Sequence, residues 1–433
     1  MDKRLFKVRS LKGNITVPGD KSISHRALIL GAMSSGENHI TGLSESLDVK
    51  TTGSVLKELG ISIEKGEGNR EVKVKGIGIK GFENISDKEY RLNCGNSGTT
   101  ARLMMGLLSG AGIKAELYGD KSLSKRPMDR VVKPLKQIGI NIESTNGHLP
   151  VIIKGGKPVP FNYKMEVASA QVKSAMILAS LFINGTSTII EPEETRDHTE
   201  RMLLLMDGDI KIKNLLNGKN IIINGRKELT PLKLTIPGDI SSAVFFIIAA
   251  LVTPNSEVKI DNVLLNPTRS YIIEILKRMG GNIEIEVKDD FPEPVGTVTA
   301  KSSKLKGISI GGFEIPLIID EIPALSAAAF FARGETIIKG ASELRVKESD
   351  RIKSIVAMIR AFGGRVEEYE DGFKIKGKNK PKPAEVMSFG DHRIAMASSI
   401  IAINTQGDTV IKEAEVVDIS FPEFFNTLES IIN

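Results

Sequence analysis

Basic side chains recur at points where a short polar turn leads into an alanine-rich segment. Lys21 and Arg26 flank such a point in TVPGDKSISHRALILGA, residues 16–32. A helix start already carries partial positive charge, so a further cation is unfavourable by about 0.3–1 kcal/mol unless an anion binds there. Further cations at such points are Arg102, Lys173, His392 and Arg393, while Arg126, Arg196 and Arg351 lie close to the starts of predicted amphipathic helices. A single one of them is typical of a solvated surface, but the recurring set predicts an anion-binding site.

Small residues stand beside these cations in GNSGTT (95–100) and VASAQ (167–171). Such residues allow backbone amides to approach a phosphate closely. GNSGTT alone is a weak signal, because it has neither P-loop nor dinucleotide GxGxxG spacing. Only its position beside the cations supports the anion site.

Two carboxylates, Asp320 and Glu348, could supply acid–base chemistry. Asp320 precedes Pro323, and Glu348 precedes a predicted helix from Asp350, so each could instead be a helix cap. A carboxylate that faces a cationic cleft can accept or deliver a substrate proton. His392 could share this work, although a lone histidine is more often structural. The sequence leaves both roles open for each acid.

Composition narrows the class of protein. The 433 residues are 41% hydrophobic and 26% charged, which predicts two folded domains. No apolar run could span a membrane, and MDKRLFKVRS does not resemble a signal peptide, so we expect a cytoplasmic protein. The single cysteine, Cys94, excludes an intrachain disulfide, and the five scattered histidines argue against a metal site. The charge surplus of 59 − 53 = 6 suits small acidic substrates or nucleic acid.

The elements that must position these residues form an internal repeat. Segments that read as strand, small polar turn and alanine-rich helix begin at residues 15, 90, 163, 232, 313 and 384. Each contains a second, amphipathic helix, such as the one with Ile272, Ile275, Leu276 and Met279 on one face. Four of these helices end at a glycine suited to a left-handed cap: Gly60, Gly139, Gly280 and Gly363. Pro134 interrupts the pattern of another.

The repeat therefore predicts an α/β protein made of six βαβαββ units of about 72 residues. The last copy lacks its final strands, and RLFKV near the N-terminus is predicted to complete it. Three units then form each of two lobes. The predicted lobes are residues 20–237 and a discontinuous lobe of 1–19 with 238–433, joined near Gly19 and Gly238.

Six motifs together carry a family resemblance: KSISHRA, GNSGTTAR, SKRP, ASAQ, RVKESDR and GDHR. With this order and spacing, the sequence resembles the EPSP synthases, the 3-phosphoshikimate 1-carboxyvinyltransferases, over essentially its full length. The resemblance implies two inside-out α/β barrels of three repeats each, with the active site in the cleft between them. It also implies transfer of the enolpyruvyl group of phosphoenolpyruvate to the 5-hydroxyl of shikimate 3-phosphate. That reaction leads to chorismate in aromatic amino-acid biosynthesis, and needs neither cofactor nor metal.

The resemblance assigns roles to individual residues. For shikimate 3-phosphate it implies Lys21, Ser22, Arg26, Ser169, Ala170, Gln171, Arg196, Asp320 and Lys347. For phosphoenolpyruvate it implies Lys21, Gly98, Arg126, Gln171, Arg351 and Arg393, with Asn96 nearby. Asp320 is expected to accept the proton of the attacking hydroxyl, Glu348 to protonate the methylene carbon, and Lys21 to assist catalysis.

Some features depart from the family pattern or leave alternatives. A lysine that some members carry before FP is absent from DISFPEFF, where Ile419 and Ser420 stand, and glyphosate sensitivity is undecided. One alternative is UDP-N-acetylglucosamine enolpyruvyl transferase, which usually has a reactive loop cysteine that YGDKSLSKRPMDR lacks. Another is a non-enzymatic polyanion- or RNA-binding protein. We expect a monomer that acts on small molecules, without nucleic acid or membrane.

Overall fold

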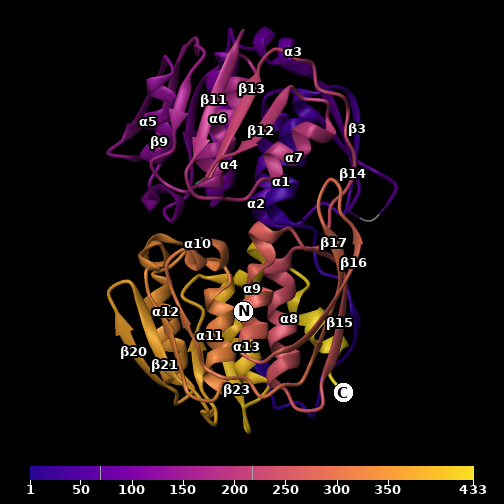
Figure 1. The fold of residues 1–433 in the computed structure, drawn as a ribbon, viewed down its shortest axis with the longest axis vertical. Coiled ribbons are helices and arrows are strands. Elements are labelled where there is room, and N and C mark those ends of the chain that lie inside the picture. The colour runs from indigo at the N-terminus through magenta and orange to yellow at the C-terminus, as the bar shows by residue number, and fades with distance from the viewer. Residues whose placement is uncertain (69, 217) are drawn as a thin grey trace. The chain divides into compact units, whose positions relative to one another are not determined.

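The structure is a computed structural model that describes residues 1–68, 70–216 and 218–433. The chain divides into two compact units (Figure 1). Unit 1 consists of Met1–Pro18 and Pro237–Asn433, and unit 2 of Gly19–Ile236. Each unit contains three small sheets and is described by itself.

Unit 2 holds three four-stranded sheets of one design. The sheets have the orders β14-β3-β5-β4, β6-β7-β9-β8 and β10-β11-β13-β12. Within each, the first pair is parallel and the other two pairs are antiparallel. The strands are β3 (Ser35–Thr41), β4 (Ser62–Lys65), β5 (Val72–Ile77), β6 (Glu89–Asn93), β7 (Lys114–Tyr118), β8 (Ile140–Thr145), β9 (His148–Gly156), β10 (Asn162–Lys164), β11 (Thr186–Glu191), β12 (Ile210–Asn214), β13 (Lys219–Asn224) and β14 (Lys233–Thr235).

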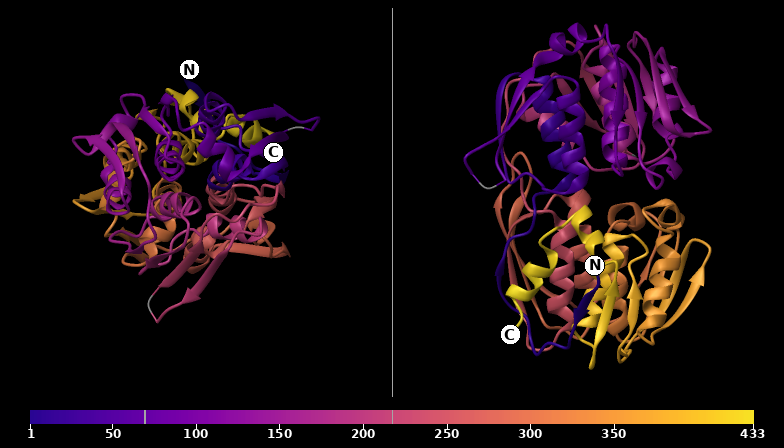
Figure 2. Two further views of the ribbon diagram at one scale, coloured as in Figure 1. Left: turned by 90° about the horizontal axis from the view of Figure 1, so that it is seen from above. Right: turned by 180° about the vertical axis from the view of Figure 1, so that it is seen from behind.

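Unit 1 repeats this design with one shorter sheet. Its sheets have the orders β16-β17-β15-β2, β18-β19-β21-β20 and β1-β23-β22. The predicted N-terminal strand is confirmed as β1, which pairs antiparallel with β23 and completes the sixth repeat (Figure 2, right). The strands are β1 (Lys3–Leu5), β2 (Lys12–Ile15), β15 (Glu257–Leu264), β16 (Asn282–Asp289), β17 (Val295–Lys301), β18 (Ser309–Ile310), β19 (Glu335–Ile338), β20 (Arg365–Tyr369), β21 (Gly372–Lys376), β22 (Glu385–Met387) and β23 (Thr409–Lys412).

The first and fourth repeats exchange their leading strands. β2 precedes the first helix of unit 2 in the chain but pairs with β15 in unit 1, with Gly13 opposite Val258. β14 precedes the fourth such helix but pairs with β3 in unit 2, with Leu234 opposite Ile40. The chain therefore passes between the units directly after each of these strands.

One alanine-rich helix follows each leading strand, and these six helices form the cores of the units. They are α1 (Lys21–Met33), α4 (Gly98–Ala111), α6 (Ala170–Ser180), α8 (Ile240–Val252), α11 (Ile322–Phe331) and α13 (His392–Ala402). Nearly all of their residues are buried, as expected for helices that are apolar on every face. In unit 1, α8, α11 and α13 pack against one another, as Figures 1 and 2 show.

In the first five repeats the second helix is amphipathic and packs its apolar face into the core. The five are α2 (Leu47–Glu58), α5 (Asp129–Gln137), α7 (His198–Leu205), α9 (Pro267–Arg278) and α12 (Arg351–Ala361). The predicted glycine stops are confirmed, because Gly60, Gly139, Gly280 and Gly363 all have positive φ. Pro134 lies inside α5 without ending it.

Shorter helical segments complete the fold: α3 (Gly78–Asn84), α10 (Glu314–Ile318), α14 (Phe424–Ser430), and the 3-10 segments η1 (Leu123–Lys125), η2 (Ser342–Val346) and η3 (Ala414–Ile419). Among the described residues, none of the helices combines the length and the apolar character needed to cross a bilayer.

The predicted leading strand of the fifth repeat, from residue 313, is wrong. This segment forms α10, and the strand β18 lies earlier, at Ser309–Ile310. Ile315 and Ile318 are buried while Phe313 is 73% exposed, so the apolar residues follow a three-residue helical spacing. The short strand β18 pairs with β19 and fills the place that the longer strand was expected to take.

The glycine stops can be tested on α2, which has one glycine after its end and another inside it. Gly60 has φ +89° with open space around a Cβ, whereas Gly53 has no positive φ and meets only Leu28 at 4.0 Å. We expect Gly60→Ala to lower the free energy of unfolding by about 1 kcal/mol, because alanine is strained in the left-handed region. Gly53→Ala should raise it by about 0.5–1 kcal/mol. Urea unfolding measures both changes. An unchanged free energy of unfolding in Gly60→Ala would contradict the prediction.

Candidate active site

Five of the six buried helices begin with a side chain that caps their backbone. Asp20 accepts from Ile23 N at 2.8 Å, Asp239 from Ser241 N at 2.9 Å and Asp391 from Arg393 N at 2.9 Å. Ser97 and Ser169 cap α4 and α6 in the same way. Because the rest of each helix is buried in apolar surroundings, polar chemistry is confined to these ends. The predicted binding residues of α1, α4 and α6 lie in the first turn or two after the caps.

The two cations at the start of α1 are fixed by neighbouring polar groups. Arg26 is buried and donates three hydrogen bonds, to Thr199 Oγ1 at 2.7 Å, Ser174 Oγ at 2.8 Å and Ser22 O at 2.8 Å. The ammonium of Lys21 lies 2.7 Å from Asp48 Oδ2. The side chain of Lys21 is 23% exposed, so solvent or a ligand can reach it.

A second group of cations surrounds the start of α4. A Cβ on Gly98 would lie 3.2 Å from Arg102 Nη1 and 3.5 Å from Arg126 Nη1, so glycine allows both guanidinium groups to approach the helix. Arg126 donates to Asn96 Oδ1 at 2.8 Å. Arg102 donates to Gln171 Oε1 at 2.6 Å. The structure therefore brings together the predicted residues Gly98, Arg126 and Gln171 in unit 2.

The start of α6 adds further predicted residues to unit 2. Ser169 is the cap of α6, Ala170 is its first residue, and the Nε2 of Gln171 donates to Thr99 Oγ1 at 3.0 Å. Arg196 lies in the loop between β11 and α7 and is partly buried. Its neighbour Thr195 is buried and hydrogen-bonded to Glu191.

Lys173 does not belong to the anion-binding set, which corrects the sequence-based prediction. Its ammonium is fully buried and lies 2.9 Å from a carboxylate oxygen of Glu191 and 2.7 Å from one of Glu200. Burial by itself would lower the pKa of Lys173, but Glu200 and Glu191 outweigh it and raise the pKa. Both partners of this cation are therefore protein carboxylates.

In unit 1, Arg351 lies at the centre of a cluster of acids. Its side chain is 1% exposed, with Nε 2.8 Å from Asp391 Oδ2 and Nη2 2.6 Å from Glu348 Oε2. Its Nη1 lies 3.7 Å from Asp320 Oδ1. Lys347 approaches the same Asp320 oxygen to 3.5 Å. The predicted catalytic acids Asp320 and Glu348 thus share one buried guanidinium.

Arg393 belongs to the same cluster through a backbone group. Its Nη1 donates to the carbonyl oxygen of Asp320 at 2.7 Å and lies 3.9 Å from Glu321 Oε1. Ser241 at the start of α8 donates to Glu321. Four carboxylates and three cations therefore converge in unit 1: Asp320, Glu321, Glu348, Asp391, Lys347, Arg351 and Arg393.

Comparison with known proteins adds the family. A family model described as EPSP synthase (3-phosphoshikimate 1-carboxyvinyltransferase) matches residues 6–428. The chain belongs to the EPSP synthase family. A protein named 3-phosphoshikimate 1-carboxyvinyltransferase from Desulforamulus reducens is 43% identical, with 98% of each chain covered. One of the same name from Streptococcus uberis is 44% identical, with 97% of each chain covered.

Solved structures agree with this assignment. An EPSP synthase from Acinetobacter baumannii is 40% identical and has a TM-score of 0.86, covering 100% of this chain and 98% of that one. The enolpyruvyl transferase NikO from Streptomyces tendae is 16% identical, with a TM-score of 0.76 over 99% of this chain and 96% of its own. At that identity, NikO shares the fold alone.

The capping alternative for Glu348 is wrong. Asp350 caps α12, accepting from Lys353 N at 3.2 Å, while the carboxylate of Glu348 accepts from Arg351. The residue before α11 is Glu321, which makes no capping bond. Glu348 is therefore positioned by a cation rather than by a helix end, and Asp320 lies beside Lys347 and Arg351.

Two acids of these clusters, Asp48 and Asp391, were not predicted from the sequence, although the sequence around each could have indicated it. Asp48 lies in the first turn of α2, where it pairs with Lys21. Asp391 is the acid of GDHR, a motif quoted only for its basic residues. Burial would raise the pKa of Asp391, but Arg351 outweighs it and holds the pKa below its usual range. Both acids orient a cation of the site.

Two buried histidines, His25 and His392, lie near the starts of α1 and α13. His25 is buried, and its Nδ1 lies 2.7 Å from Thr52 Oγ1. Burial, followed by the charges of Lys21 and Arg26, holds the pKa of His25 well below its ordinary value. His392 is 1% exposed at the start of α13. His25 is therefore neutral at neutral pH.

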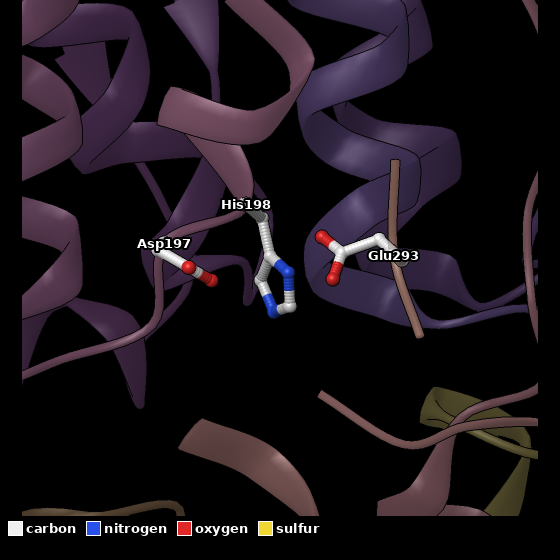
Figure 3. A group of neighbouring side chains, drawn as sticks. All are labelled: Asp197, His198 and Glu293. Atoms are coloured by element: carbon white, nitrogen blue, oxygen red, sulfur yellow. The ribbon is translucent and has the colours of Figure 1, made fainter. Parts of the chain in front are cut away.

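Asp197 and His198 lead into α7 in unit 2, and Figure 3 labels them together with Glu293 of unit 1. Asp197 Oδ2 accepts from Arg201 Nε at 2.8 Å. Glu293 Oε2 accepts from Asn266 Nδ2 at 2.7 Å. Each carboxylate thus has a partner within its own unit, and we propose no metal centre from these residues.

The environment of Cys94 predicts an inert thiol. Cys94 is fully buried, and burial raises the pKa of its thiol to about 12. Because the thiolate is the reactive form, we expect the folded protein to resist a disulfide reagent such as dithionitrobenzoate at about pH 8. The same reagent should react fully in concentrated urea, which is the control. Rapid reaction in the folded state, followed by absorbance, would contradict the burial.

The pair of Asp391 and Arg351 predicts a large, pH-dependent contribution to stability. Asp391→Asn should lower the free energy of unfolding at neutral pH by about 3–5 kcal/mol, because it leaves a buried guanidinium short of one charge partner. The pKa of Asp391 is lower in the folded protein than in the unfolded protein, where it is about 4. The ionised carboxylate therefore stabilises the folded protein above about pH 4, and this stabilisation is lost as the pH falls through the folded-state pKa. The difference in free energy of unfolding between Asp391→Asn and wild type, measured by urea unfolding, should therefore become smaller in acid.

The matched control for Asp391→Asn is Asp408→Asn. Asp408 pairs with Arg4 at 3.2 Å, but the two side chains are 44% and 71% exposed. Surface pairs contribute about 0–1 kcal/mol, so this variant should be close to wild type at every pH. Equal losses in the two variants would contradict the importance of burial.

Proposed function

We propose that this member of the EPSP synthase family transfers the carboxyvinyl group of phosphoenolpyruvate to the 5-hydroxyl of shikimate 3-phosphate. The observation that carries the proposal is the placement of Asp320 within reach of Lys347 and Arg351, on a chain whose other cations gather at helix starts. A carboxylate among cations suits proton transfer between anionic substrates. The names of the relatives supply 3-phosphoshikimate as the acceptor and carboxyvinyl as the transferred group.

Unit 2 is proposed to bind the phosphate of shikimate 3-phosphate. The first turns of α1 and α6 offer backbone amides there, and Arg26 is already fixed by three hydrogen bonds. A pre-positioned guanidinium loses little side-chain entropy when an anion arrives. The proposed binding residues are Lys21, Ser22, Arg26, Ser169, Ala170, Gln171 and Arg196, together with Asp320 and Lys347 of unit 1.

Phosphoenolpyruvate is proposed to bind at the guanidinium groups around α4. Gly98 leaves room at the helix start, and Arg126 can offer its planar fork to a carboxylate or phosphate. Lys21 and Gln171 are proposed to reach both substrates. Arg351 and Arg393 of unit 1 are proposed to complete the set, so that one reaction draws on both units.

The proposed chemistry is addition followed by elimination. Asp320 accepts the proton of the 5-hydroxyl while the hydroxyl oxygen bonds to C2 of phosphoenolpyruvate. Glu348 protonates the methylene carbon, which becomes a methyl group. The result is a tetrahedral ketal phosphate. Cleavage of the bond between C2 and the phosphate oxygen then releases inorganic phosphate, and Glu348 takes back a methyl proton, which restores the methylene. The cations stabilise the charge that develops on the phosphate and carboxylate.

We further propose that the 47.0 kDa chain acts as a cytoplasmic monomer on these small molecules, without nucleic acid or membrane as a partner. The family supports small-molecule substrates. The buried Cys94 differs from the reactive loop cysteine expected of a UDP-N-acetylglucosamine enolpyruvyl transferase, which is therefore not favoured.

The test of the proposal is phosphate release from purified protein given both substrates. Release should require shikimate 3-phosphate and phosphoenolpyruvate together and should saturate with each. Replacing shikimate 3-phosphate by UDP-N-acetylglucosamine should abolish it. No release with the intended pair, or equal release with the nucleotide sugar, would overturn the proposal.

Asp320→Asn provides the sharpest variant. Removing the proton acceptor while preserving its shape should lower kcat by about 10²–10⁴-fold. The matched control is Asp371→Asn in the same unit, whose Oδ2 accepts from Gly340 N at 2.8 Å, a bond that asparagine can also accept. The control should keep near-normal turnover. Similar kcat values for the two variants in the phosphate assay would rule out the role given to Asp320.

A further inference from the structure

The buried group of Lys173, Glu191 and Glu200 needs an explanation that anion binding does not give. The exposed fractions of the three side chains are 0%, 1% and 2%, and the side chains place one ammonium between two carboxylates. Burial raises the pKa of Glu191, which shows the cost of its charge. Buried ion pairs are often no more stabilising than apolar residues of the same volume. Stability alone is therefore a poor reason for this group.

The group joins the two ends of the segment that carries Arg196. On one side, Glu191 Oε1 accepts from Thr195 N at 2.9 Å and also from Thr195 Oγ1, while Lys173 Nζ lies 3.5 Å from Thr195 O. On the other side, Lys173 binds Glu200 in the first turn of α7 at 2.7 Å. Residues 195 and 200 are thus both anchored to one ammonium, with Arg196 between them.

The neighbouring positions of the same helices hold Arg26. Ser174 follows Lys173 on α6 and Thr199 precedes Glu200 on α7, and both hydroxyls accept from Arg26. The two hydroxyls also lie 2.8 Å from each other. A shift of α7 relative to α6 would therefore move the partners of Arg26 as well as the segment of Arg196.

We propose that Lys173, with Glu191 and Glu200, is a positioning group that sets Arg26 and Arg196 for the phosphate of shikimate 3-phosphate. The inference rests on the proposed function and deepens it. Lys173 touches no substrate in this proposal and acts only through the loop and α7. Its loss should weaken the binding of shikimate 3-phosphate while leaving the binding of phosphoenolpyruvate and the chemical step nearly intact.

The mildest test is Thr195→Val, which keeps the shape and removes the hydroxyl bond to Glu191. We expect KM for shikimate 3-phosphate to rise about fivefold, the effect of one ordinary hydrogen bond. The KM for phosphoenolpyruvate, at saturating shikimate 3-phosphate, and kcat should stay within twofold of wild type. The control is Thr405→Val, a buried threonine of unit 1 that donates to Ile401 O at 2.8 Å and should change neither KM.

A second comparison separates positioning from stability. Lys173→Met alone leaves two buried carboxylates and should lower Tm sharply. Lys173→Met with Glu191→Gln and Glu200→Gln removes all three charges and should regain much of that Tm. We expect the weakened binding of shikimate 3-phosphate, measured by calorimetry, to persist in the triple variant, because the ammonium that links the loop to α7 is still missing. Recovery of affinity together with Tm would overturn the inference.

The wild-type protein distinguishes the two possible failures. If it releases no phosphate from the two substrates, the proposed function fails. If it is active but Thr195→Val and the triple variant bind shikimate 3-phosphate as wild type does, the function stands and the positioning role fails.

Discussion

The constraint on which the rest of the structure depends is the burial of six apolar helices, each of which has to satisfy its first backbone amides. Water cannot reach the sides of these helices, so their polar groups are concentrated at the starts. Aspartate and serine caps take some of the amides, and the cations of α1, α4 and α13 stand close beside them. The helix dipole and the side chains then favour the same kind of guest, an anion.

The proposed roles of the two units differ, and so do the contacts of their charged side chains. Around α1 and α4, the partners of Arg26 and Arg126 include the neutral groups of Ser174 and Asn96, and Lys21 pairs with Asp48. In unit 1, by contrast, three cations face four carboxylates, and Arg351 alone contacts three of these. An excess of cations suits binding of anions. Carboxylates held by a buried guanidinium suit proton transfer, because the guanidinium fixes their orientation.

Much of this fold could be predicted from the sequence because similar segments recur in it at a nearly constant spacing. Six recurrences of strand, turn and alanine-rich helix gave the units, and glycines such as Gly60 marked the helix ends through a backbone conformation that other residues avoid. The fifth repeat failed because Ile315 and Ile318 suit a strand and a helix equally in so short a run. The pairing of β2 with β15 is a long-range choice that no local pattern records.

The site could be predicted where motifs mark helix starts. The prediction failed where burial decides the role of a charged side chain. Lys173 and Arg26 are both cations near the start of a buried helix, and sequence gives no reason to separate them. The structure separates them by their partners, since Arg26 meets hydroxyls and a carbonyl while Lys173 meets two carboxylates. Lys173 is also fully buried between these two carboxylates, so it is not proposed to touch a substrate. Its proposed role is to hold the segment that carries Arg196 and the helix that carries Thr199, so one of several similar helix starts serves positioning rather than binding.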